Sequence, residues 1–362
     1  MSTQIHNGLT GSRFINMCVA NWFLHIYVYA IIPLLTYQVM RMGQSEMWVG
    51  LGVLAFAVGM VLPGPFGAHL MERRSRKAIY LKALIALGPL ATVGYVYAAD
   101  VRLLIGMQLL QGIAYGVSQT ALGTTLVNDI LLSRHRNKGD IIYGWAGRIG
   151  IPLGLFFGYG LSLALPVQQA YFWTLVPCAL SFVLVAQTVV PIKAPVKVPI
   201  LTFDRFFLPC SLPLALSMFA APWVMGRLAG AFPQSVSWLL GSAYICLSLG
   251  VLMAFLAQLF IRRRVGQRTL VAIGYTFVVL GLLLVSLPNL AIGNIGDLLL
   301  GCGIGAVSSR HLMDWVTNSA HCQRGTAQNT YLICWRWYFS LGLLCTCLCG
   351  FSNTLIDIAL CI

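Results

Sequence analysis

Long apolar runs constrain the fold of this chain more than any other feature of its sequence. Runs of about 18 to 25 apolar residues recur along almost the whole length, and a helix needs about 20 residues to cross the hydrocarbon core of a bilayer. Charged residues make up 9% of the chain and apolar residues 59%, whereas soluble domains carry about 25% charged residues. The sequence therefore excludes a water-soluble fold and predicts an all-α polytopic membrane protein.

The apolar runs predict eleven full membrane spans. We expect them at residues 14–38, 47–70, 78–98, 103–127, 141–163, 168–190, 206–228, 236–260, 269–288, 295–316 and 328–350. Twelve residues, 351–362, follow the last run. They predict a twelfth helix that is short or truncated.

Topology accounts for the formal net charge of +14. If the N-terminus is cytoplasmic, sixteen basic residues lie on the cytoplasmic side, and Arg41, Arg102 and Arg227 lie towards the other. This asymmetry is the positive-inside pattern, so we expect membrane lipids, and not nucleic acid, beside these cations. The sixteen are Arg13, Arg73, Arg74, Arg76, Lys77, Arg134, Arg136, Lys138, Lys193, Lys197, Arg205, Arg262, Arg263, Arg264, Arg268 and Arg324.

The ends and loops of the chain favour a bacterial inner membrane. The N-terminal residues are polar and lead into a full-length apolar run without a small-residue cleavage site, so no cleaved signal is expected. Most of the eleven cysteines lie inside apolar runs, which indicates reduced packing residues. The loops are short and contain no Asn-x-Ser/Thr sequon. We therefore expect a multi-pass protein with a cytoplasmic N-terminus.

An internal repeat organises the spans. Residues 45–50 recur at 235–241, and residues 109–116 recur at 298–305, at offsets near 190. The basic turn at 73–77 likewise recurs at 263–268. Because repeats decide architecture, the chain is interpreted as a duplicated six-helix unit.

An even number of spans in each repeat makes the two repeats parallel, related by a pseudo-twofold axis along the membrane normal. We expect an N-terminal bundle at 1–190, a cytoplasmic linker at 191–205 and a C-terminal bundle at 206–362. Folds of this kind place the substrate between the halves near the midplane.

The turn after the second span carries a recognisable motif. Residues 68–77 read Ala-His-Leu-Met-Glu-Arg-Arg-Ser-Arg-Lys and resemble the major facilitator superfamily (MFS) signature G-x-L-x-D-R-x-G-R-K. Ala68, Glu72 and Ser75 depart from it without changing the charge. The resemblance implies an MFS-like fold of two six-helix bundles that moves a solute by alternating access.

The resemblance also implies a cytoplasmic clamp, in which the motif pairs with an acid at the end of the fourth span. That acid would be Asp129, and Asp314 is roughly its repeat mate. The alternative is that these are solvated interfacial charges. The motif residues concerned are Glu72, Arg73, Arg76 and Lys77.

Two further family motifs match imperfectly. In the fourth span, Gln108 stands where the R-x-x-Q-G motif has its arginine, which argues against proton antiport by the usual route. In the fifth span, the glycine-rich stretch 147–154 resembles an antiporter motif loosely, and small residues at such spacing are common wherever membrane helices pack closely.

Two arginines lie deep within predicted spans. Trp145-Ala146-Gly147-Arg148 corresponds to Ile333-Cys334-Trp335-Arg336 at an offset of 188. The fold axis would bring Arg148 and Arg336 towards the centre, where guanidinium groups suit a carboxylate or a phosphate. The alternative is that both belong to the cytoplasmic gate.

Other polar residues share helix faces in the first half. Asn21, His25 and Tyr29 follow at four-residue spacing, and Gln108, Gln111 and Tyr115 form a similar face in the fourth span. These six complete the predicted substrate cavity with the two arginines, although packing against neighbouring helices is the alternative for each face.

Four ionisable groups complete the set of candidates. His25 and Asp297 are the candidate proton sites. Ionisable groups inside a membrane are costly, so those that occur there usually have a function. Arg310 and Asp314 are four residues apart and predict a local ion pair.

The motifs exclude several other functions. The sequence contains no Gly-Lys-Ser/Thr phosphate loop and no His-x-x-x-His or Cys-x-x-Cys metal pair in a loop. We therefore expect no cofactor, no metal and no enzyme activity. The function predicted is secondary active transport of a small polar or anionic organic solute, with a coupling proton or ion left open. The alternatives are a proton antiporter that exports drug-like compounds and a non-transporting membrane scaffold or sensor.

Overall fold

The described chain is built from helices. The structure is a computed structural model that describes residues 8–123, 127–132, 135–190, 199–203, 206–231, 238–261, 266–287, 289–319 and 323–349. The helices up to residue 190 are α1 (Ser12–Arg41), α2 (Met47–Val61), α3 (Gly64–Arg73), α4 (Arg76–Ile85), the π-helix η1 (Ala86–Leu90), α5 (Ala91–Val96), α6 (Val101–Ala121), α7 (Val127–Ile130), α8 (Arg136–Ala164) and α9 (Val167–Gln187).

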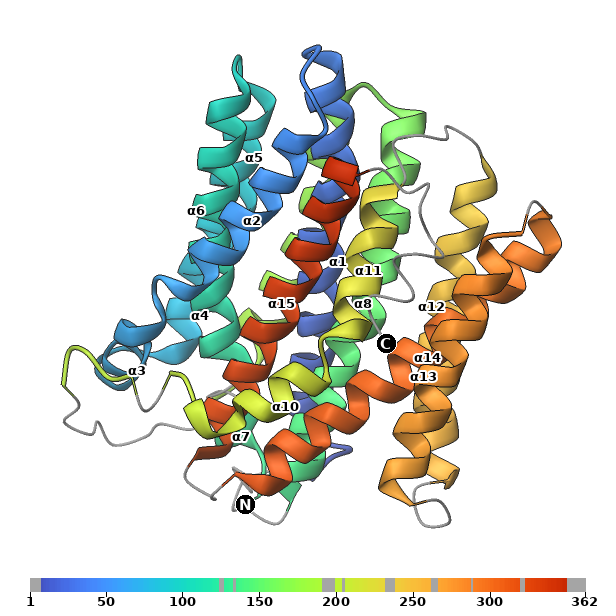
Figure 1. Cartoon of the computed structure of the whole chain (residues 1–362). Helices are drawn as coiled ribbons and strands as arrows, with labels where there is room; N and C mark the ends of the chain where they lie inside the picture. Colours follow the sequence, from blue (N-terminus) through green and yellow to red (C-terminus); the bar gives the residue numbers. More distant parts are fainter. Residues whose placement is uncertain are drawn as a thin grey trace.

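The described residues after residue 205 also form helices. They are the short 3-10 helix η4 (Pro209–Ser211), α10 (Leu212–Ser217), α11 (Ala220–Ala231), α12 (Trp238–Ile261), α13 (Gln267–Val285), α14 (Leu290–Asn318) and α15 (Arg324–Cys349). In Figure 1, α5 and α6 lie at one side and α12 to α14 at the other, with α1, α8, α11 and α15 between them.

The long apolar helices confirm a multi-pass membrane protein. Among the described residues, seven helices are long and apolar enough to cross a membrane, or nine if each of two bent pairs is one span. Helix α6 lies at the predicted fourth span, and the described part of α12 contributes a shorter apolar helix, Ser242–Gln258, at the predicted eighth. The total of eleven spans therefore stays a prediction. The predicted twelfth helix, 351–362, and most of the linker lie outside the described residues.

Two of the predicted spans, 47–70 and 206–228, are each built from two helices with a bend between them. The break between α2 and α3 bends the chain by 47°, and that between α10 and α11 bends it by 60°. Pro63 and Pro65 flank the start of α3, and Pro222 cannot donate a hydrogen bond to the carbonyl of Met218, where α10 ends. Proline removes a helical hydrogen bond and disrupts the preceding turn.

Helix pairs pack in the same pattern before and after residue 200. Helix α1 packs on α8 and α2 packs on α6, while α11 packs on α15 and α12 packs on α14. Across the bundle, α15 packs on α2 and α8 packs on α12. The third predicted span, built from α4, η1 and α5, and the sixth, α9, lie against these helices.

Glycines allow the closest of these contacts. A Cβ atom added at Gly112 of α6 would lie 2.1 Å from the carbonyl oxygen of Phe56 in α2. One added at Gly59 would lie 2.3 Å from the carbonyl oxygen of Leu109. Small residues let membrane helices approach at backbone distance, where van der Waals packing replaces the hydrophobic driving force available in water.

Replacing Gly112 with valine should therefore force α2 and α6 apart. Overpacking of a well-packed contact costs about 1–3 kcal/mol, so Gly112→Val should lower the thermal unfolding midpoint of the detergent-purified protein. Gly106→Val is the matched control on the same helix, because an added Cβ there has nothing within 4 Å. Equal midpoints for the two variants would contradict this packing.

Candidate substrate site

Two arginines are buried at mid-depth. Arg148 of α8 and Arg336 of α15 each lie twelve residues after the first residue of their helix, Arg136 or Arg324. At 1.5 Å per residue that places them about 18 Å along the helix, near the middle of a bilayer core about 30 Å thick. Their side chains are 5% and 3% exposed.

The guanidinium group of Arg148 lies against aromatic rings of α15. Its Cζ atom lies 4.5 Å from the ring centroid of Tyr331 and 4.7 Å from that of Trp335. Its Nε donates to the hydroxyl of Tyr331 at 3.2 Å, and its Nη1 donates to the carbonyl of Gly144 at 2.9 Å. Its Nη2 has no hydrogen-bond partner.

The guanidinium group of Arg336 is enclosed by rings from three helices. Its Cζ atom lies 4.1 Å from the ring centroid of Phe56 in α2, 4.7 Å from that of Tyr29 in α1 and 5.3 Å from that of Phe339 in α15. Its Nε and Nη1 have no hydrogen-bond partner. Cation–π contacts of this kind stabilise a desolvated cation by about 2 kcal/mol.

Neither guanidinium pairs with a carboxylate among the residues that the structure describes. The ion pairs found there involve Arg76 and Arg310 instead. A buried cation without a counter-ion is costly. The rings lie beside both groups, while several of their N–H groups have no partner, and an anion forms charge-assisted hydrogen bonds with such groups. The arrangement is therefore suited to an anionic ligand.

The predicted His25 lies beside this centre and has both ring nitrogens engaged. Its Nδ1 lies 2.8 Å from the carbonyl oxygen of Asn21 and therefore donates, because a carbonyl only accepts. Its Nε2 then accepts from the hydroxyl of Tyr115 at 3.1 Å. The ring of His25 also stacks on Tyr29, with centroids 6.3 Å apart. A Cβ atom added at Gly147 would lie 2.7 Å from this imidazole, so the glycine makes room for it.

A closed hydrogen-bonded ring fixes Asn21. Gln119 donates to the side-chain oxygen of Asn21 at 3.1 Å, Asn21 donates to the carbonyl of Tyr143 at 2.9 Å, and the hydroxyl of Tyr143 donates back to Gln119 at 3.3 Å. Sequence reasoning missed Gln119 and Tyr143. The signal was present, since Gln119 continues the four-residue spacing of Gln111 and Tyr115.

The two glutamines of α6 that were predicted to line the cavity contact neighbouring helices of the first 190 residues. Gln111 accepts from the hydroxyl of Tyr95 at 2.8 Å and donates to the hydroxyl of Tyr27 at 3.1 Å. Gln108 is 2% exposed, and a Cβ atom added at Gly52 would lie 3.5 Å from its Cγ. Their place in a substrate cavity stays a prediction, and helix packing accounts for the contacts of Gln111.

The motif residues tie the turn between α3 and α4 to neighbouring segments. Arg76 forms ion pairs with Glu72, at 3.1 Å, and with Asp129. Lys77 donates to the carbonyl of Thr188 at 2.9 Å, and Arg73 is exposed. These described contacts lie within the first 190 residues, and a gating role for them stays a prediction.

Three further acids complete the inventory. The predicted ion pair between Arg310 and Asp314 is confirmed at 2.8 Å. The predicted proton site Asp297 is 8% exposed within α14.

Sequence reasoning missed Asp140, which is 1% exposed and has no hydrogen-bond partner at either carboxylate oxygen. Its place near the start of α8 looks like a helix terminus in the sequence, where an acid is ordinarily exposed.

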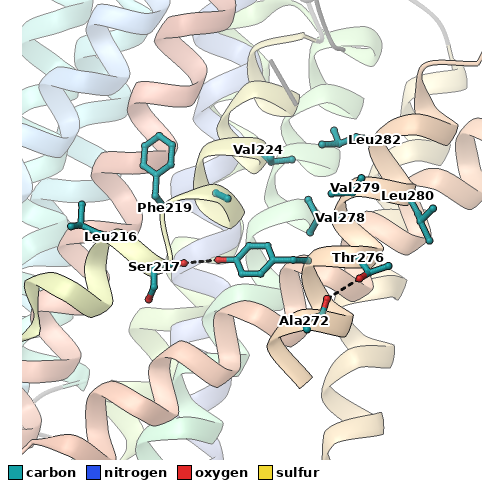
Figure 2. Close-up of a pocket in the computed structure, with 12 residues that line it drawn as sticks. Leu216, Ser217, Phe219, Val224, Ala272, Thr276, Val278, Val279, Leu280 and Leu282 are labelled. Atoms are coloured by element: carbon teal, nitrogen blue, oxygen red, sulfur yellow. Dashed lines mark hydrogen bonds between the residues drawn. The ribbon is translucent and has the colours of Figure 1, made fainter. Parts of the chain in front are cut away.

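A separate apolar cavity of about 580 Å³ lies between the bent helix pair α10–α11 and α13. Figure 2 shows the lining residues of α10 and α11 towards the left of the view and those of α13, such as Val278 and Leu282, towards the right. Tyr275 of α13 also lines this cavity, and its hydroxyl donates to the carbonyl of Ser217 at 2.5 Å. None of the predicted site residues lines this cavity, so it is distinct from the two arginines.

The helices and the buried charges define a polytopic membrane protein with a polar centre. Residues 17–343 match the family model of the Major Facilitator Superfamily. The chain belongs to this superfamily, whose members are secondary transporters of small solutes and not enzymes. No curated protein matches the sequence significantly.

Solved transporter structures share the fold at low sequence identity. A mutant of the nucleoside transporter NupG is 13% identical with a TM-score of 0.69, and 96% of each chain is covered. The human organic anion transporter MFSD10 (TETRAN) is 17% identical with a TM-score of 0.67, covering 97% of this chain and 96% of that one. A bacterial homolog of the human lysosomal transporter Spinster is 16% identical with a TM-score of 0.65, covering 94% and 83%.

Breaking the ring at Gln119 should destabilise the protein. Gln119→Leu leaves the side-chain oxygen of Asn21 and the hydroxyl of Tyr143 without their partner, and an unsatisfied buried polar group costs about 1–3 kcal/mol. The thermal unfolding midpoint should fall clearly below that of Gln187→Leu, the matched control at an exposed position in α9. A Gln119→Leu midpoint equal to the control would mean that the ring contributes nothing.

Proposed function

We propose that this transporter moves a small organic anion and binds it between Arg148 and Arg336. The observation that carries the proposal is the pair of buried guanidinium groups with unpartnered N–H groups and no carboxylate partner among the described residues. An anion at their edges would supply the missing acceptors and neutralise both charges. The fold is also similar to that of a protein described as an organic anion transporter.

Residues 1–190 and 206–362 are proposed to form two six-helix halves joined by a cytoplasmic linker at 191–205. The repeated packing supports this division, because α1 on α8 and α2 on α6 correspond to α11 on α15 and α12 on α14. The corresponding close contacts agree in detail. A Cβ at Gly154 would lie 2.7 Å from the carbonyl oxygen of Ile26, and one at Gly342 would lie 2.2 Å from that of Trp223.

The offset between Gly154 and Gly342 is 188 residues, as it is between Arg148 and Arg336. A pseudo-twofold axis along the membrane normal would relate these positions and place one arginine from each half beside the axis. Alternating access then follows as rocking of the halves about a central anion. Eleven full spans and a short or incomplete twelfth belong to the same proposal.

The membrane orientation rests on charge. A cytoplasmic N-terminus in a bacterial inner membrane places the basic turn at 73–77 in the cytoplasm, beside lipid phosphates. The ion pairs of Arg76 with Glu72 and Asp129 then form the cytoplasmic clamp, with Arg310 and Asp314 as its counterpart in the second half.

A coupling proton remains part of the proposal, with His25 and Asp297 as its sites. Asp297 has the stronger support, since it is buried at 8% exposure, whereas both ring nitrogens of His25 are already engaged. Drug export receives no separate support from the glycine-rich stretch. Gly147, Gly150 and Gly154 are explained by close packing of α8 on α1.

Replacing either arginine should weaken anion binding selectively. Charge-assisted hydrogen bonds contribute about 1.5–3 kcal/mol, so Arg148→Gln or Arg336→Gln should raise the dissociation constant of an anion about ten- to hundredfold. The measurement is a thermal-shift screen of carboxylates, phosphate esters and neutral sugars, because a bound ligand raises the unfolding midpoint.

Arg102→Gln is the matched control, because Arg102 lies on α6 and is exposed. It should leave the thermal shift unchanged. Anion shifts that survive the double Arg148→Gln and Arg336→Gln change, or shifts given by neutral sugars alone, would overturn the anion assignment.

A further inference from the structure

The two arginines cross between the proposed halves in opposite directions. Arg148 belongs to the first half, and its guanidinium lies over Tyr331 and Trp335 of the second. Arg336 belongs to the second half, and its guanidinium lies over Tyr29 and Phe56 of the first. Each half therefore supplies aromatic rings that form cation–π contacts with the arginine of the other half.

A hydrogen bond strengthens one of these crossings. The hydroxyl of Tyr331 accepts from Nε of Arg148 at 3.2 Å and donates to the carbonyl of Ser308 at 2.8 Å. Arg148 of α8 is thereby tied to the backbone of α14 through one side chain of α15. All three residues are buried, at 5% exposure or less.

The halves also touch on both sides of the arginines along the helix axes. Beyond Arg336, Ser340 donates to the carbonyl of Val53 in α2 at 3.2 Å. Before Arg148, the ring of Trp145 lies 4.6 Å from that of Phe255 in α12, between centroids. The crossed contacts therefore lie inside a continuous interface between the halves.

The rings leave part of each guanidinium group without a partner. The Cζ atom of Arg148 lies 4.5 Å from the ring centroid of Tyr331 and that of Arg336 lies 4.1 Å from the ring centroid of Phe56, whereas Nη2 of Arg148 and Nε and Nη1 of Arg336 have no hydrogen-bond partner. An aromatic face attracts a cation through its quadrupole, and most strongly where water is excluded. The attraction that brings each arginine to the opposite half therefore does not depend on an anion at its edge.

Closing the halves removes water from both guanidinium groups, and a desolvated cation without a partner is costly. Without such rings, an anion would be required in every closure, and the carrier would be restricted to exchange. Rings from the opposite half offset part of this cost, because they are present whether or not an anion is bound.

We propose that these crossed cation–π contacts allow the carrier to switch between its inward-facing and outward-facing states without a bound anion. It would then carry out net transport and would not be an obligatory exchanger. The proposal deepens the proposed function and rests on it, since it concerns the same two arginines and the same two halves.

The test follows the switching of the full-length protein in liposomes by single-molecule fluorescence energy transfer. Dyes on unnatural amino acids at the exposed positions Lys138 of α8 and Arg268 of α13 report the separation of the two halves at one end of the bundle. Chloride is the probe anion and is titrated from high to trace concentration. The wild type should exchange between two states at a rate that chloride does not change.

Phe56→Leu and Trp335→Leu each remove one crossed contact and should slow closing in trace chloride about tenfold. Phe172→Leu is the matched control, because Phe172 is 49% exposed and distant from the arginines in sequence. It should leave the rate unchanged. Wild-type switching that stops when chloride is withdrawn, or equal rates for Phe56→Leu and Phe172→Leu, would overturn the proposal.

Failure of the proposed function gives a different pattern. Anions that raise the unfolding midpoint through Arg148 and Arg336, combined with no switching in trace chloride, would refute net transport and retain the anion site. Switching in trace chloride with no anion-dependent stabilisation would instead refute the anion site.

Discussion

The burial of two guanidinium groups in the membrane interior is the constraint on which the central structure depends. A charge at this depth requires partners, and the chain supplies aromatic faces to Arg148 and Arg336 instead of carboxylates among the described residues. Aromatic faces stabilise a cation without cancelling its charge. The centre of the protein therefore keeps two positive charges, and its ligand chemistry follows from this choice of partner.

The apolar runs, the internal repeat and the spacing of polar residues predicted the parts of the structure that depend on such sequence patterns. The apolar runs located the helices, and the repeat offset drew attention to Arg148 and Arg336 as equivalent buried positions. The ion pair of Arg310 with Asp314 was predictable because both residues lie on one helix, one turn apart. These features are set by local spacing, which a sequence displays directly.

Features that depend on contacts between distant segments were not predictable in the same way. The rings around Arg336 come from α1, α2 and α15, and no spacing in the sequence shows that Phe56 faces this arginine. The burial of Asp140 depends on what packs over the start of α8. The apolar runs continue through the bends in α2–α3 and α10–α11, so the runs alone do not show them.

Side-chain hydrogen bonds inside the first proposed half can be compared with those that join the two halves. Inside the first proposed half, Tyr27 donates to the carbonyl of Leu87, Gln38 donates to that of Tyr95, and Ser181 donates to that of Ala20. Between the halves, the side-chain hydrogen bonds found in the described chain join Arg148 to Tyr331 and Ser340 to Val53. Relative motion of the two proposed halves would strain these two hydrogen bonds and leave those inside the first half intact, so the first half would move as one unit.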